Sequence, residues 1–88
     1  MNTDFLEKLR LLLYFCFNEQ FEEINFGGKP GPIEIVSYSG KTYSGKTFWG
    51  RFKLADQFAV IDWVEISIDG KFHRFTYHPE LEEPFVRN

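Results

Sequence analysis

The sequence FAVIDWVEISIDGKFHRFTY spans residues 58–77 and has the pattern of a β-hairpin. Its first part, residues 58–68, is rich in β-branched and aromatic side chains, which is typical of a strand. Asp69-Gly70 follows, a pair that favours a two-residue turn because both residues tolerate positive φ. Residues 71–77 are therefore predicted to return antiparallel to the first strand.

Two further strands are predicted before this hairpin. Residues 33–38 are rich in β-branched side chains. Residues 48–54 alternate, so that phenylalanine and leucine share one face while Trp49, Arg51 and Lys53 share the other. Between the two strands, over residues 39–48, SGKTY is followed directly by SGKTF. This duplication predicts a lengthened hairpin tip.

One helix is predicted ahead of the strands, over residues 3–24, because apolar residues recur there at helical spacing. A Gly/Pro linker over residues 27–32 ends it, and residues 78–88 form a loosely attached acidic tail. We therefore expect one α+β domain covering residues 1–88. Its N-terminal helix packs on a curved, four-stranded antiparallel β-meander over residues 33–77, with a small Sm-like or SH3-like barrel as the closed variant.

The helix also predicts self-association. The apolar run over residues 11–17 makes its middle apolar nearly all round, and such a helix needs cover on more than one side. One small sheet covers one side. We therefore expect a homo-oligomer, with a dimer favoured, formed through the N-terminal helix.

Composition limits the function classes. The chain has 88 residues, a net charge of −3 and 19% aromatic residues, eleven of them phenylalanine. The charge gives no general attraction to nucleic acid or to anionic membranes, and a run of seven apolar residues is too short to span a bilayer. A single cysteine, Cys16, forms no internal disulfide. A cytoplasmic protein is the expectation.

Two sequence features resemble a phosphate-binding site and a metal site but lack the structural context that such sites need. Residues 40–47, GKTYSGKT, fit the phosphate-binding pattern G-x-x-x-x-G-K-[ST], but that chemistry needs a helix after the lysine, and a predicted strand follows instead. His73 and His78, the only histidines, are expected to point to opposite faces and lack further ligands for a metal. We expect no catalytic residue, no metal and no cofactor.

Asp62 interrupts the apolar face of the strand at residues 58–68. A bulge at Asp62 would turn the carboxylate outward and bring Trp63 inward. The alternative is a buried carboxylate paired with Arg51 or Arg74. The bulge is favoured, because burying an unpaired carboxylate is costly.

The central hairpin carries the candidate contact surface. Residues 29–55 hold five basic groups against one acidic group, and aromatic and basic side chains interleave there. Trp, Tyr and Arg dominate the binding energy of protein interfaces, whereas aromatic and basic groups together also bind single-stranded nucleic acid. The third interpretation is that the outer face of this hairpin is merely solvated and binds no partner. The candidate residues are Tyr38, Lys41, Tyr43, Lys46, Trp49, Arg51 and Lys53.

A family resemblance adds an alternative. Within residues 33–61, two features match a known family. Residues 33–40 resemble its first strand and the Asn-Gly-type turn that follows. The spacing of its first signature motif is repeated, with residues 41–45 taken as a duplication in the turn, by Ser44-Gly45, Gly50, Asp56-Gln57-Phe58 and Val60-Ile61. The chain resembles there the Sm-like family, in particular its bacterial Hfq-type branch. The resemblance implies a helix followed by a bent five-stranded sheet, a ring assembly, and RNA binding at Gln57 and Phe58.

The main functional expectation is a small, non-catalytic interaction protein, regulatory or accessory, that binds an as yet unidentified protein partner through the basic and aromatic hairpin. The alternative is an Sm-like RNA-binding ring protein. Nucleic acid is the less favoured partner, because the chain is acidic overall.

Overall fold

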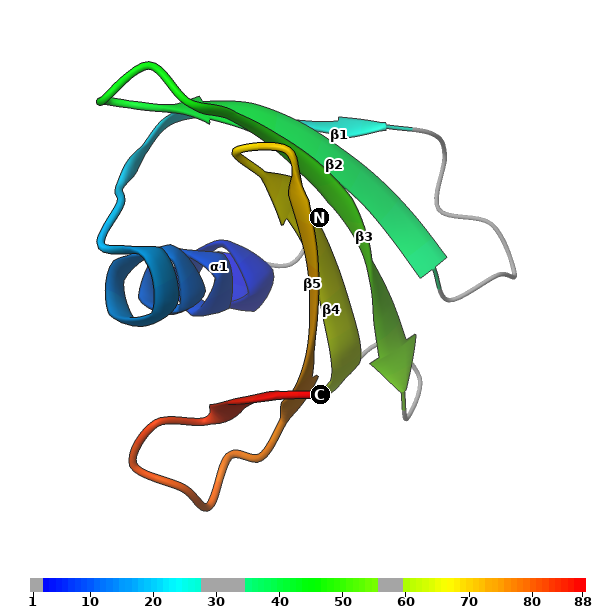
Figure 1. Cartoon of the computed structure of the whole chain (residues 1–88). Helices are drawn as coiled ribbons and strands as arrows, with labels where there is room; N and C mark the ends of the chain where they lie inside the picture. Colours follow the sequence, from blue (N-terminus) through cyan, green and yellow to red (C-terminus); the bar gives the residue numbers. More distant parts are fainter. Residues whose placement is uncertain (1–2, 28–34, 56–59) are drawn as a thin grey trace.

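The computed structural model describes residues 3–27, 35–55 and 60–88, which form one helix and an open antiparallel sheet (Figure 1). The chain order is α1 (Thr3–Phe17), β1 (Phe21–Gly27), β2 (Ile35–Thr42), β3 (Thr47–Ala55), β4 (Val60–Ile68), β5 (Lys71–Tyr77) and β6 (Phe85–Arg87). The strands lie in the sheet in sequence order. The α+β class is confirmed. The described sheet has six strands rather than four, and its open order does not confirm a barrel.

The helix ends at Phe17 rather than at Ile24, so this part of the prediction is wrong. Asn18 takes a left-handed conformation with φ of 53°, which asparagine tolerates and which ends a helix. Phe21 and Ile24 belong instead to edge strand β1, whose register shifts by one residue between Phe21 and Glu23. Because of this bulge both side chains pack against the core, and their three-residue spacing imitates that of a helix.

The sheet curves around α1, so the helix lies on its concave side (Figure 1). Phe5 of the helix stacks on Phe52 of β3, with ring centroids 3.6 Å apart. The other fully buried large apolar side chains come from the helix and from strands β3, β4 and β5, namely Leu9, Leu12, Leu13, Phe48, Val64, Ile66 and Phe75. One curved sheet therefore covers most of the helix. Leu11, Tyr14 and Phe15 stay exposed on the opposite side of α1.

The predicted bulge at Asp62 is confirmed. Lys53 pairs with Trp63 and Leu54 with Ile61, so Asp62 is the extra residue of β4. Asp62 is exposed, and its carboxylate lies 3.9 Å from Nζ of Lys53. Trp63 does not turn inward as expected, because the bulge brings Ile61 to the core instead. Asp62 and Trp63 are thus consecutive residues on the convex side.

Both predicted turns are present. Asp69 and Gly70 have φ of 58° and 73°, as a tight two-residue hairpin requires. In the β2–β3 hairpin the first copy of the repeat continues β2, and the second copy forms the turn and starts β3. Strand β3, not a helix, follows Lys46, so the phosphate-binding pattern lacks the geometry it needs.

The C-terminal segment is not a loose tail, contrary to the prediction. Residues 85–87 form β6, which pairs with β5, and the rings of Phe85 and Tyr77 lie 5.2 Å apart. The N–H of His78 donates to the carbonyl of Pro84 at 2.7 Å. The acidic residues of this segment lie in the loop before β6, and an apolar strand holds that loop to the sheet. Most of the predicted 27–32 linker lies outside the described residues, and Gly27 ends β1.

Candidate functional site

The predicted contact residues separate onto two faces of the sheet. Trp49, Arg51 and Lys53 alternate with buried residues of β3 and lie on its convex face, as predicted. Lys41 is exposed on β2, and Tyr43 and Lys46 lie in the turn. Tyr38 is only 3% exposed and belongs to the core, so its assignment to the contact surface is wrong. Gln57 and Phe58 lie outside the described residues.

Tyr38 has a structural role instead. Its side chain crosses β3 at Gly50, and its hydroxyl donates a 2.8 Å hydrogen bond to the carbonyl of Glu65 on β4. A Cβ at Gly50 would overlap that same carbonyl. Burial, and to a lesser extent the Glu65 carboxylate, raises the pKa of the Tyr38 phenol well above its usual value. Gly50 therefore makes room for a buried neutral phenol that joins three strands.

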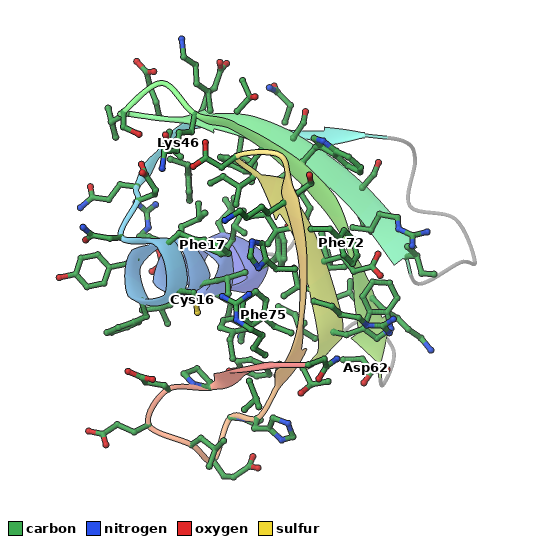
Figure 2. All side chains as sticks on the ribbon, viewed as in Figure 1. Cys16, Phe17, Lys46, Asp62, Phe72 and Phe75 are labelled. Carbon is green, nitrogen blue, oxygen red and sulfur yellow. The ribbon has the colours of Figure 1, made fainter. Side chains whose placement is uncertain are left out.

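Strand register arranges the convex face in three rows. Trp49 pairs with Ser67, which pairs with Phe72. The next rows are Arg51, Glu65 and Arg74, and then Lys53, Trp63 and Thr76. Trp49 and Phe72 are each 61% exposed, and Figure 2 shows Phe72 on the side of β5 away from the helix. We call these nine residues the convex patch.

The middle row is held by ion pairs. Nε and Nη2 of Arg51 donate to Oε1 of Glu65 at 3.1 and 2.8 Å, and Nη1 of Arg74 lies 3.7 Å from the other oxygen. Both guanidinium groups also approach the ring of Trp63, at 6.0 and 4.5 Å from its centroid. The arginine-paired carboxylate considered for Asp62 thus occurs at Glu65. These contacts fix both arginines before any partner binds.

Lys46 joins the two hairpin turns at the edge of this patch. Its Nζ lies 3.3 Å from a carboxylate oxygen of Glu19 and 3.1 Å from one of Asp69. Hydrogen bonding to Asp69 and Glu19 raises the pKa of Lys46, and the 2.6 Å hydrogen bond from Ser44 chiefly lowers the pKa of Glu19. The sequence suggested that Lys46 is available to a partner. In the structure its ammonium group instead pairs with two carboxylates of the same chain.

A groove of about 380 Å³ lies between these turns and reaches Trp49. Thr47 and Ser67 line it, as do Lys46 and Asp69, which pair with each other. The groove is mostly polar, so it suits a hydrogen-bonding group of a partner whose apolar part contacts Trp49.

Sequence analysis missed Phe72, Trp63, Glu65 and Arg74 as members of this surface. The signal was present in the Asp69-Gly70 turn, because a two-residue hairpin fixes the register of the two strands it joins. That register places Phe72 opposite Ser67 and Arg74 opposite Glu65. The same register places Trp63 opposite Thr76, so Trp63 could be found in the same way.

Comparison of the chain with protein-family models, with curated proteins and with solved structures gives no match. In residues 3–27, 35–55 and 60–88, no group of three or more His, Cys, Asp and Glu side chains is arranged to hold a metal ion. Within the same residues, no helix is both long and apolar enough to cross a membrane.

Proposed function

We propose that this protein is a small, non-catalytic interaction module that binds a protein partner through the convex patch. The carrying observation is the exposure of Trp49 and Phe72 beside two arginines that are already fixed by Glu65. Tryptophan and arginine are the residues that most often dominate interface energies. Large exposed aromatic side chains on a folded surface commonly mark a binding site.

The charges of the patch indicate the chemistry of the partner. Arg51, Lys53 and Arg74 outnumber Glu65 there and Asp62 next to it, and Glu65 is only 9% exposed at its side chain. A partner segment with an apolar side chain flanked by carboxylates fits this surface. The apolar side chain would contact Trp49 and Phe72, while carboxylates on either side would approach the arginines.

The test compares substitutions of exposed apolar side chains inside and outside the convex patch. A partner is first identified by affinity capture and then bound as a purified protein to each variant. Trp49→Ala and Phe72→Ala should each weaken binding at least tenfold, as interface hot spots do. Leu81→Ala, which removes an exposed apolar side chain from the loop before β6, serves as the control. Equal affinity of wild type, Trp49→Ala and Phe72→Ala would refute the proposal.

An Sm-like RNA-binding ring is the alternative function, supported by the resemblance over residues 33–61 and by aromatic rings that could stack on bases. It differs in its salt response. RNA affinity should fall steeply with salt, and Lys41→Gln with Lys46→Gln should flatten that dependence. A ring should also appear as a hexamer or heptamer in light scattering. RNA affinity without a salt slope would dispose of this alternative.

We further propose that α1 mediates a homodimer. Leu11, Tyr14 and Phe15 form an exposed apolar face, next to a small cleft that Pro84 and Phe85 also line. Phe15→Glu should convert a dimer into a folded monomer, measured by light scattering. An unchanged mass for Phe15→Glu would place any interface elsewhere. Cys16, a free thiol, fits the reducing cytoplasm that we propose as the compartment.

A further inference from the structure

A cavity of about 280 Å³ lies on the concave side of the sheet, apart from the convex patch. Its walls come from the end of α1, the two hairpin turns, β5 and β6. Figure 2 shows Cys16 and Phe17 of the helix and Lys46 of the hairpin turn on this side, opposite to Phe72. Phe17 and Ile68 give the cavity an apolar wall.

The charges around this cavity do not cancel. Lys46 and Asp69 both line it, and they pair with each other at 3.1 Å. Lys71 and Arg87 also line it, and among the side chains that the structure describes, in residues 5–27, 35–54 and 61–88, no Asp or Glu lies within ion-pair distance of either one. The cavity therefore carries two positive charges without a partner among the described carboxylates.

Contacts within the chain hold Arg87 in place. Its guanidinium lies over the rings of Phe75 and Phe17, 4.9 and 5.9 Å from their centroids. It also bonds to Nδ1 of His73. Because a guanidinium only donates, Nδ1 of His73 must accept, and the ring proton of neutral His73 is then on Nε2.

His73 reports the positive field of the cavity. Burial lowers its pKa first, and the charges of Arg87 and then Lys71 lower it further. The other titratable groups that line the cavity are the paired Lys46 and Asp69 and the thiol of Cys16. Burial raises the pKa of Cys16, and Glu83, which lines the neighbouring cleft, raises it further against the opposing effect of Arg87. Neutral His73 therefore adds no third positive charge to the lining of the cavity.

We propose that this cavity binds a small organic carboxylate with an apolar body, such as an aromatic acid. The carboxylate would lie between Lys71 and Arg87, and the body against Phe17 and Ile68. The size fits, because a cavity of roughly 150 Å³ accommodates benzene and the space here is larger. Inorganic phosphate would satisfy the two cations but would leave the apolar wall without a contact.

Nuclear magnetic resonance titration of the full chain with benzoate tests the proposal. Resonances of His73 and Phe17 should shift and saturate, and the pKa of His73 should rise when the anion neutralises the field of Lys71 and Arg87. Benzyl alcohol has the ring without the charge, and inorganic phosphate has the charge without the ring. Each should bind more weakly than benzoate. Equal affinity for either one, or benzoate shifts that never saturate, would overturn the proposal.

Matched variants locate the site. Lys71→Gln removes an exposed charge from the cavity and should weaken benzoate about three- to fivefold, the range of one partly exposed ion pair. Lys41→Gln makes the same change on an exposed β2 side chain away from the cavity and should leave the affinity unchanged. If both variants weaken benzoate equally, the binding is nonspecific and the site is refuted. Amide spectra confirm that both variants remain folded.

Discussion

The two faces of the sheet use the same strands for different purposes. On the concave face, β3 contributes Phe52, which is 0% exposed and stacks on Phe5 of the helix. On the convex face, the same strand contributes Trp49 and Arg51, which are exposed. Alternation along one strand thus separates side chains that stabilise the fold from those available to a partner. It follows that stability and binding should respond to different substitutions.

The largest contrast should come from the same substitution on opposite faces. Phe52→Ala removes a fully buried ring and should lower the free energy of unfolding by about 3–5 kcal/mol. Phe72→Ala removes an exposed ring and should change it by no more than about 0.5 kcal/mol. Urea denaturation followed by circular dichroism measures both.

Phe52→Ala can leave too little folded protein to measure. Phe52→Leu keeps part of the buried volume and should give a smaller loss, still larger than that of Phe72→Ala. Similar losses for the Phe52 variants and for Phe72→Ala would mean that the convex face is itself covered. Self-association through that face would be the natural cause, and light scattering would detect it.

Tyr38→Phe tests the buried hydrogen bond that joins β2 to β4 across Gly50 of β3. It removes the hydrogen bond to the Glu65 carbonyl and should lower the free energy of unfolding by about 1 kcal/mol. Burial raises the pKa of Tyr38, so the folded chain keeps a proton that the unfolded chain loses above about pH 10. Stability of the wild type should therefore fall as pH rises beyond that value.

The variant should lack this part of the alkaline fall. Urea denaturation at pH 8 and pH 10.5 compares the two proteins, and Tyr43→Phe, at an exposed turn residue, is the control. Identical alkaline losses in wild type and Tyr38→Phe would show that the phenol does not stay protonated in the fold.

Sequence patterns predicted the elements whose local signals agree. Alternation identified β3, and Asp69-Gly70 identified the β4–β5 hairpin. The errors lie where a β-bulge shifts the alternation of side chains between the two faces of a strand. A bulge in β1 placed Phe21 and Ile24 on one face at helical spacing, and the bulge at Asp62 brought Ile61 rather than Trp63 to the core. A one-residue insertion reverses every later side chain, and periodicity alone does not register it.

The binding surface was predicted only in part for a related reason. The β2–β3 hairpin was identified from adjacent residues, but two thirds of the convex patch comes from β4 and β5. Pairing between strands brings Phe72 and Trp49 into one row, although 23 positions separate them in the sequence. Tyr38 was assigned to the wrong face because an aromatic side chain is compatible with either face of a strand. The exposed serines at positions 37 and 39 are the signal that Tyr38 points inward.

A double-mutant cycle at Arg51 and Glu65 addresses the ion pairs of the convex face. Arg51→Ala, Glu65→Ala and the double variant should give a coupling energy of about 0.5–1 kcal/mol, since the arginine is largely exposed. The cycle is measured by urea denaturation at low and moderate salt. A coupling that vanishes at low salt would mean that Arg51 is not fixed before binding, which would weaken the case for a preorganised patch.

The smallest expected effect lies at the rim where the two faces meet. Hydrogen bonding from Ser44 and the pairing with Lys46 lower the pKa of Glu19. The folded chain therefore binds fewer protons there than the unfolded chain, and the stabilisation is present above the ordinary glutamate pKa and lost as pH falls through the lowered one. Stability of Glu19→Gln should depend less on pH in that acid range than stability of the wild type.

Ser44→Ala should reproduce part of this change, because it removes the main cause of the lowered Glu19 pKa without removing the charge. Thermal unfolding between pH 3 and pH 6 measures all three proteins. Equal slopes would show that the Glu19 carboxylate does not stabilise the fold through these contacts and that Asp69 alone holds Lys46 at the rim.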